Sequence, residues 1–296
     1  MITWQDSLIS ITFDRATSTA IHLSQELSQS FGNWTYEQCM YQLTKVGSDI
    51  VRERANPLDP KAHMKRISEQ RQQIQDIIAG ATAHLKDSRR CRNLHDKLQH
   101  WAYYMHMSYI QSELCRPAIS PTAPRSDLAK NHKEACIEGL VNTVEAYVAL
   151  QNLHSYASRS WPALHRCISS SLLLGILREH LRNEKARSLI EEFLKYLYRV
   201  TADVDPTDLA PPIKRSLHAL AKLYSEAIPA TPAPTSTTTS STTLDTTATD
   251  QFSFNDWNLL DSPSWLNMSP LLSVGSGDSP YAMMDQIIWG QKQSPR

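Results

Sequence analysis

Glycine is scarce in this chain, with only eight in 296 residues. A sheet protein of this size needs many tight turns, and such turns commonly use glycine because it adopts positive φ at little cost. The long stretches rich in Leu, Ala, Glu, Gln, Lys and Arg instead favour helix. With 41% apolar residues, the chain can bury a sizeable core. The composition therefore predicts an all-α fold, an irregular multi-helix domain.

Apolar residues recur every three or four positions over most of residues 1–228, which is the period of an amphipathic helix. Proline, glycine and asparagine interrupt this pattern and separate the helices. The segment at 61–86 carries thinly spread apolar residues, so we expect a partly exposed helix there. Helices are predicted at about 18–31, 35–54, 61–86, 94–115, 127–156, 160–177, 184–200 and 212–228.

The sequence changes character after residue 228. Residues 229–251 are a tract of Pro, Ala, Ser and Thr with almost nothing to bury, which predicts a disordered linker. Residues 1–228 hold 28 Lys and Arg against 24 Asp and Glu, a balance of +4, whereas residues 229–296 hold two against six, a balance of −4. No Lys, Arg or His occurs between Pro229 and Gln291.

Residues 252–296 interleave aromatic and aliphatic side chains with aspartates. This pattern is typical of acidic activation segments that fold on a protein partner. The simpler alternative is a disordered end with incidental aromatics. The activation-like residues are Phe252, Phe254, Trp257, Leu260, Trp265 and Leu266.

The five cysteines lie at least 21 residues apart, which is neither a disulfide framework nor the paired spacing of a zinc site. We expect reduced thiols. Cys91 and His95 share one helix face, but two ligands do not make a zinc site, so a solvated helix start is the better interpretation. Cys115 beside Arg116 is interpreted as a buried thiol at a helix end rather than as a nucleophile.

Motifs of catalysis are missing from the sequence. There is no GxSxG, no HExxH, no glycine-rich phosphate loop and no dinucleotide fingerprint. The most apolar run, residues 168–177, is too short to cross about 30 Å of hydrocarbon. The sequence therefore predicts no enzyme, no cofactor, no metal site and no membrane partner.

Three stretches occur in a fixed order over about residues 3–200: "WQDSLISITFDR" at 4–15, "YYMHMSYIQSELCRPAI" at 103–119 and "SRSWPALHRCISSSLLLGIL" at 158–177. Together they resemble the middle homology region of fungal-specific zinc binuclear cluster transcription factors. Ala16 stands where that family usually has proline. The resemblance is carried by Trp4, Asp6, Asp14, Arg15, Arg116, Pro117, Trp161 and His165.

The resemblance implies a helical regulatory domain, a nuclear location and control of a set of metabolic genes. It also implies an N-terminal six-cysteine cluster holding zinc, but this sequence lacks those ligands and the front of the homology region. We therefore expect the rear part of such a regulator, contacting DNA only indirectly or through a missing N-terminal segment. No DNA-binding residue is identified.

Protein partners follow from this interpretation: a coactivator for the tail, and a second copy or a related regulator for the helical domain. Trp161 and His165 are interpreted as packing residues, with a ligand pocket as the alternative. The alternative function is a modulator that does not bind DNA and that pairs with or titrates full-length regulators.

Overall fold

The computed structural model describes residues 10–11, 32–55, 59–154, 160–202, 209–225 and 279–290. Within these ranges the regular structure is helical, without strands, and the one isolated β-bridge joins Trp34 to Ala81. The predicted all-α class is therefore confirmed. None of the described helices is both long enough and apolar enough to cross a membrane.

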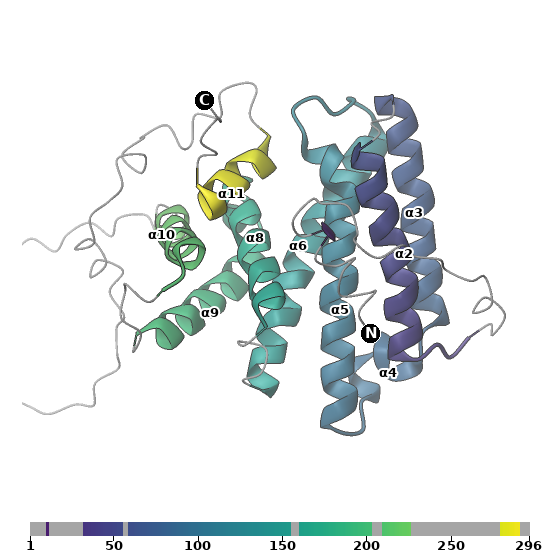
Figure 1. Ribbon diagram of the computed structural model, residues 1–296, viewed down its shortest axis with the longest axis horizontal. Helices are drawn as coiled ribbons and strands as arrows, with labels where there is room; N and C mark the ends of the chain where they lie inside the picture. Colours follow the sequence, from purple (N-terminus) through teal and green to yellow (C-terminus); the bar gives the residue numbers. More distant parts are fainter. Residues whose placement is uncertain are drawn as a thin grey trace, which may run out of the picture.

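The helices form two groups on either side of one long central helix (Figure 1). The central helix is α6 (Asp127–Leu153), and α5 (Leu94–Cys115) packs along it more extensively than any other pair of helices packs. Beyond α5 lie α2 (Tyr36–Ala55) and α3 (Pro60–Gly80), with the short α4 (Ala83–Lys86) at one end. These elements make the first group.

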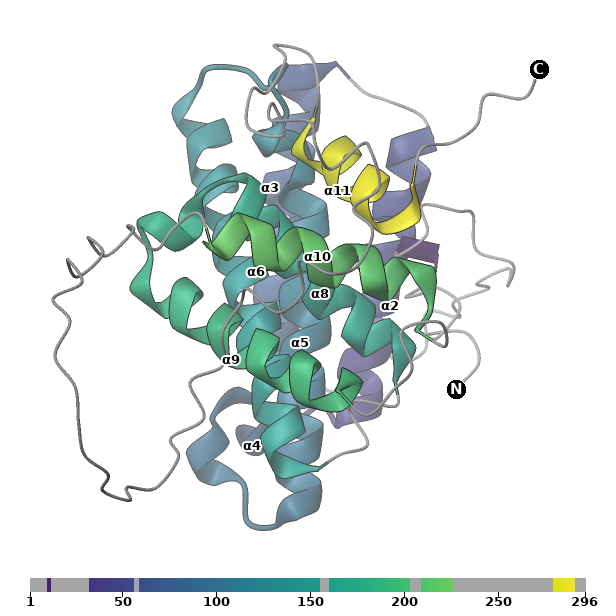
Figure 2. The same ribbon diagram turned by 90° about the vertical axis from the view of Figure 1, so that its left-hand side faces the viewer.

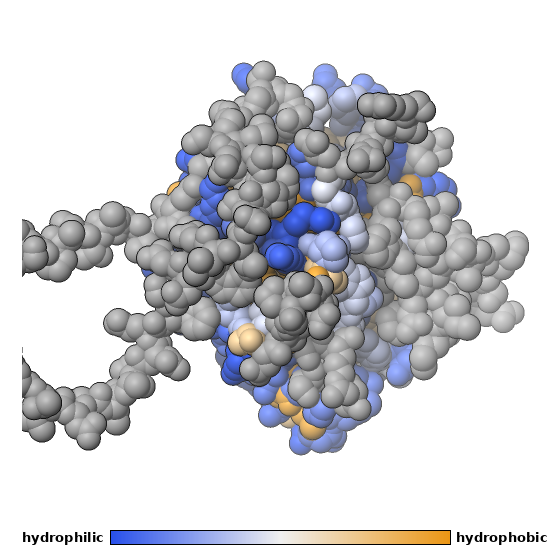
Figure 3. All heavy atoms as spheres, turned by 60° about the vertical axis from the view of Figure 1, so that its left-hand side comes forward, coloured by the Kyte–Doolittle hydropathy of each residue, from blue (hydrophilic) through white to orange (hydrophobic). Residues whose placement is uncertain are grey.

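The second group covers the opposite side of α6. It consists of α8 (Trp161–Ile176), α9 (Glu184–Thr201), α10 (Pro211–Ser225) and α11 (Pro280–Trp289). Figure 2 looks onto this group and shows α10 lying across α8, with α9 and α11 on either side of it. On the face drawn in Figure 3, hydrophilic side chains dominate the described surface and hydrophobic ones form small separate patches.

Side-chain caps explain why several helices begin where the sequence predicted. Ser126 accepts a hydrogen bond from the Ala129 amide at the start of α6, and Asn183 accepts one from the Ala186 amide at the start of α9. Such caps satisfy amide groups that have no partner inside the helix. The predicted starts at 127 and 184 are therefore confirmed.

The single helix predicted over 61–86 is wrong. α3 ends at Gly80, and the chain then pairs with Trp34 before α4 begins. The Trp34 amide donates to the Gly80 carbonyl at 2.8 Å, and the Thr82 amide donates to the Trp34 carbonyl at 3.0 Å. A Cβ atom at Gly80 would lie 3.0 Å from the Trp34 indole, so any other residue there would require the indole to move.

A continuous apolar core joins the two groups through α6. At Gly139 α5 and α6 approach each other closely, because a Cβ atom there would lie 2.8 Å from the Ser108 carbonyl oxygen and 3.0 Å from the Ser112 amide nitrogen. The missing side chain lets the two backbones touch.

The helix α11 was not predicted from the sequence. It lies inside residues 252–296 and packs on α8 and α10 with four buried side chains, Tyr281, Met284, Ile287 and Ile288. The helix predicted at 18–31, the linker at 229–251 and the six activation-like residues from Phe252 to Leu266 lie outside the described residues.

Candidate functional site

Two of the family-like residues that the structure describes, Arg116 and His165, contact α11. Arg116 and Pro117 begin the short helix η3 (Arg116–Ile119) after α5, and Trp161 and His165 lie in the first turns of α8. Arg116 contacts the N-terminal half of α11, and His165 contacts its C-terminal end. The other four such residues, Trp4, Asp6, Asp14 and Arg15, lie outside the described residues.

The Arg116 guanidinium anchors the first turns of α11. It lies over the Tyr281 ring, 4.0 Å from the centroid, and 4.0 Å from a carboxylate oxygen of Asp285. On its other side it lies 3.7 Å from the carboxylate of Glu113. A cation over an aromatic face contributes about 0.5–2 kcal/mol, more when water is excluded. Arg116 therefore links the end of α5 to α11.

Glu113 is the buried carboxylate that organises this end of the site. Only 5% of its side chain is exposed, and Arg54 from α2 donates to it at 2.6 Å. A buried carboxylate needs such partners because an unpaired charge in the core is costly. Arg54 and Arg116 thus hold α2, α5 and η3 together around one acidic group.

A hollow of about 370 Å³ opens beside these residues. Arg54 and Arg116 line it together with Pro117, His63 from α3 and Ser279 at the start of α11. The structure therefore places the family-like Arg-Pro pair at a hollow next to α11, where both lining arginines are paired with Glu113.

The opposite end of α11 rests on His165. The His165 ring stacks on Trp289, with centroids 5.6 Å apart, and meets Trp161 edge-on at 5.7 Å. Burial, and then the neighbouring Arg166, lower the pKa of His165 to about 4, so the imidazole is neutral near pH 7. This arrangement supports the packing interpretation of Trp161 and His165.

Ser160 occupies the N-cap position of α8, but its side chain makes no capping hydrogen bond. Pro162, in the first turn, needs no amide partner there. The start of α8 is held by Trp161 and His165 packing rather than by a capping hydroxyl.

Arg215 from α10 fixes the last turn of α11. Its guanidinium donates to the Ile288 carbonyl at 2.7 Å and 3.2 Å and to the Ile287 carbonyl at 3.3 Å. Neither carbonyl accepts a hydrogen bond from an amide inside the helix, because both lie in its last turn. A cation at a helix C-terminus also interacts favourably with the helix dipole. α11 ends at Trp289 and is followed by Gly290, whose φ is +80°.

Arg166 is a buried cation that sequence reasoning missed. It is 1% exposed, donates from Nη1 to His106 Nδ1 at 2.6 Å and lies 5.2 Å from the Tyr109 ring centroid. No carboxylate of the described residues forms an ion pair with it. Burial lowers its pKa, and burial together with Arg166 lowers the pKa of His106 well below its usual value. An arginine inside an apolar helix run is the only sequence signal for this feature.

The cysteines do not form a metal centre among the described residues. Cys39, Cys115, Cys136 and Cys167 are fully buried, and burial raises the pKa of Cys115 to about 12. Cys91 is half-buried, and no group of three or more possible ligands surrounds it or any other cysteine in the described ranges.

Comparisons of the chain with protein-family models, with curated proteins and with solved structures gave no match. The resemblance to zinc-cluster regulators therefore stays a prediction that depends on the three quoted stretches.

Proposed function

We propose that the chain is a transcription regulator of the fungal zinc-cluster type. It acts in the nucleus through its helical body and the activation-like segment at 252–266. The observation that carries the proposal is the docking of α11, because this helix follows that segment in the sequence and packs on Arg116 and His165. Both residues belong to the stretches that resemble the family.

The docking supplies a physical link between the body and the segment. α10 ends at Ser225 and α11 begins at Pro280, and the two helices pack against each other. The two helices that flank residues 226–279 therefore lie on the same face of the helical body. A coactivator that binds the aromatic and acidic side chains would be held next to α8, α10 and α11.

A reporter assay tests this proposal. The full chain is fused to an unrelated DNA-binding domain, and transcription is measured from a promoter carrying that domain's site. We expect output above that of the DNA-binding domain alone, and a loss of most of this gain on Trp257→Ala with Trp265→Ala. Aromatic side chains contribute much of the binding energy at such interfaces.

The matched control is Leu181→Ala, which removes an apolar side chain that is 56% exposed in the described body. It should leave output unchanged. Equal output from the double tryptophan variant and the parent fusion, at equal protein level, would refute the role of the segment.

A modulator that pairs with full-length regulators is the second candidate function. The observation that favours it is the placement of the cysteines: the sequence has five, and four are buried in the helical core. A six-cysteine zinc cluster cannot be assembled from them. A gel-shift experiment with the purified chain separates the two functions, because a sequence-specific shift would exclude the modulator.

A further inference from the structure

A cluster of basic residues lies where α4 joins α5. Residues 86–97 make this connection and include the short helix η2 (Ser88–Arg90). Both ribbon views place it at the α4 end of the helical body, opposite the end where α11 lies (Figures 1 and 2). The connection holds five Lys and Arg against two Asp, a balance of +3 in a chain whose net charge is zero. We call residues 86–97 the basic connector; its cations are Lys86, Arg89, Arg90, Arg92 and Lys97.

The cationic side chains of the basic connector are all exposed to solvent. Arg90 lies 4.0 Å from a carboxylate oxygen of Asp87, and Lys86 donates to the Ala79 carbonyl at 3.2 Å. The other three side chains form no ion pair and no hydrogen bond within the described residues: Arg89, Arg92 and Lys97. These three cations can therefore bind an external anion without giving up a partner in the protein.

The two aspartates of the basic connector bind its own backbone. Asp87 accepts a hydrogen bond from the Arg89 amide at 3.0 Å, and Asp96 accepts one from the Arg92 amide at 2.9 Å. Asp96 also lies in the first turn of α5, where a negative charge interacts favourably with the helix dipole. Main-chain amides thus engage both carboxylates, which leaves the guanidinium groups of Arg89 and Arg92 without an acidic partner there.

Contacts with α5 fix the conformation of the basic connector. His100 Nδ1 lies 3.0 Å from the His84 carbonyl oxygen and 3.1 Å from the Leu85 carbonyl oxygen. The Cys91 thiol donates to the same His84 carbonyl at 3.7 Å, and Leu85 is buried. A folded surface rather than an extended peptide therefore carries the cations, and such a surface loses less conformational entropy when it binds.

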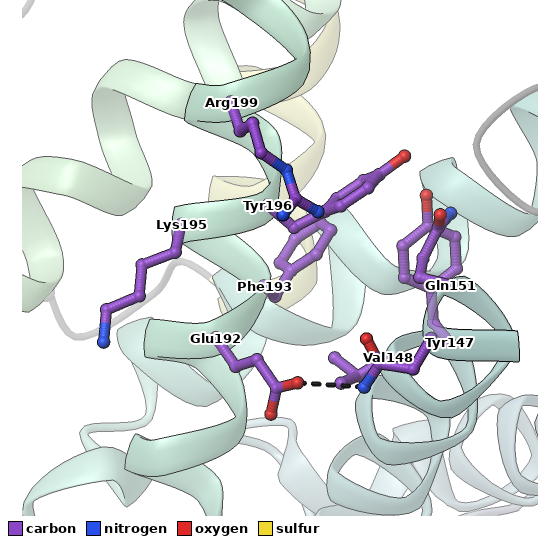
Figure 4. A pocket seen from close by; sticks show the side chains of 9 residues that line it. Tyr147, Val148, Gln151, Glu192, Phe193, Lys195, Tyr196 and Arg199 are labelled. Carbon is purple, nitrogen blue, oxygen red and sulfur yellow. Dashed lines mark hydrogen bonds between the residues drawn. The ribbon is translucent and has the colours of Figure 1, made fainter. Parts of the chain in front are cut away.

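α9 also carries exposed cations, but acids accompany them. It holds four Lys and Arg against three Glu, a balance of +1. Figure 4 shows Glu192, Lys195 and Arg199 on this helix. Arg187, on the same helix, pairs with Glu184 at 2.7 Å. The excess of positive charge in the basic connector is therefore larger than on α9, which can serve as a control surface.

The side chains of the basic connector match the phosphate groups of a DNA duplex. Three of its five cations are arginines, whose planar guanidinium presents paired N–H donors to phosphate oxygens. Duplex DNA carries one negative charge per about 1.7 Å of helix axis, so several neighbouring cations can each meet a phosphate. Residues 86–97 contain no aromatic side chain, and aromatic side chains are what stack on single-stranded bases and anchor many protein interfaces. This composition favours a duplex backbone over a single strand or a protein.

We propose that the basic connector binds the phosphate backbone of duplex DNA without reading its sequence. Arg89, Arg92 and Lys97 make the main phosphate contacts, and Arg90 adds a fourth. Contacts of this kind supply affinity and orientation but carry no sequence information. The proposal does not rest on the transcription role, because it concerns the purified chain and any DNA duplex.

Fluorescence anisotropy with two labelled DNA duplexes of unrelated sequence tests the proposal on the full chain. We expect both duplexes to bind saturably and with equal affinity at about 50 mM salt. Three or four phosphate contacts give a slope of about −2.7 to −3.6 for log K against log salt concentration. The affinity should therefore fall about 40- to 150-fold between about 50 and 200 mM salt.

Two double variants with the same change of charge assign the binding to residues. Arg89→Gln with Arg92→Gln should weaken both duplexes and make the slope less negative by about 1.8, because two phosphate contacts are lost. Lys195→Gln with Arg199→Gln removes two exposed cations of α9 and should leave the affinity and the slope unchanged. All four positions are exposed, so both variants should keep the helix content of the parent by circular dichroism.

Three results would overturn the proposal. The first is the absence of saturable duplex binding at about 50 mM salt. The second is an equal loss of affinity in the two double variants, because net charge alone would then explain the binding. The third is tighter binding to polyglutamate or to vesicles containing phosphatidylserine than to DNA, lost on Arg89→Gln with Arg92→Gln. That result would assign the basic connector to an acidic protein or to a membrane surface.

Discussion

Lowering the pH from 7.5 to 5.0 should destabilise the helical body through its buried histidines. His165 is 3% exposed, and its pKa is lowered to about 4 by burial and by Arg166. In the unfolded chain a histidine has a pKa of about 6.5. As the pH falls, the unfolded state binds the proton first, so stability is lost between about pH 6.5 and 4.

The size of this loss follows from the two pKa values. At pH 5.0 the unfolded His165 is almost fully protonated and the folded one almost fully neutral, which removes about 2 kcal/mol relative to pH 7.5. His106 adds to the loss, because burial and Arg166 lower its pKa well below the usual value. The free energy of unfolding of a domain is only about 5–15 kcal/mol, so a change of this size is readily measured.

Urea denaturation followed by circular dichroism at 222 nm measures this change at pH 7.5, 6.5, 5.5 and 5.0. His165→Phe should keep the aromatic contacts with Trp161 and Trp289 and remove about 2 kcal/mol of the loss between pH 7.5 and 5.0. His95→Phe, at an exposed position on the first turn of α5, is the matched control and should keep the parent's pH dependence. A parent stability that is flat over this range, or a His165→Phe variant with the parent's slope, would refute the reasoning.

Two further predictions concern Arg166 and the cysteines. Arg166→Met should raise the free energy of unfolding by about 1–2 kcal/mol and so raise the urea midpoint. The reason is that an apolar side chain replaces a buried cation that has no carboxylate partner among the described residues. A lower midpoint would show that the contacts of Arg166 with His106 and Tyr109 outweigh the cost of its desolvation. Of the five thiols, only Cys91 should react quickly with a disulfide reagent in the native protein, since the other four are buried. Cys91→Ser should abolish the fast phase, and a remaining fast equivalent would contradict the burial of the others.

Helices that have both a clear apolar period and a capping residue in their own sequence were predictable. α5, α6 and α9 combine a clear helical period with a capping side chain at Asn93, Ser126 or Asn183, so their starts follow from local chemistry. The break after Gly80 was not predictable, because it depends on Trp34, far away in the sequence, filling the space beside that glycine. Local propensity favours a continuous helix there, and the tertiary contact overrides it.

α11 is a helix that could not be predicted from local sequence, because tertiary contacts stabilise it. A ten-residue helix is marginal by itself, because helix nucleation is costly. Its stability comes from Arg116, His165 and Arg215, which belong to three other elements. The sequence of residues 280–289 carries no sign of these partners. The packing of α9 on α6 was equally hidden, because the Tyr147 and Phe193 rings meet only when α9 folds back on α6.

Consecutive residues of α8 connect the two groups of helices. Side chains of neighbouring helix residues point about 100° apart, so His165 faces Trp289 of α11 while Arg166 faces His106 and Tyr109 of α5. Burial, and then Arg166, lower the pKa of both His165 and His106, so the same cation adds to the effect of burial at each imidazole. Protonation of His165 would place a second positive charge beside Arg166 and next to the Trp289 contact. The docking of α11 should therefore weaken in acid together with the α5–α8 contact, and Arg166→Met should reduce the pH dependence of both.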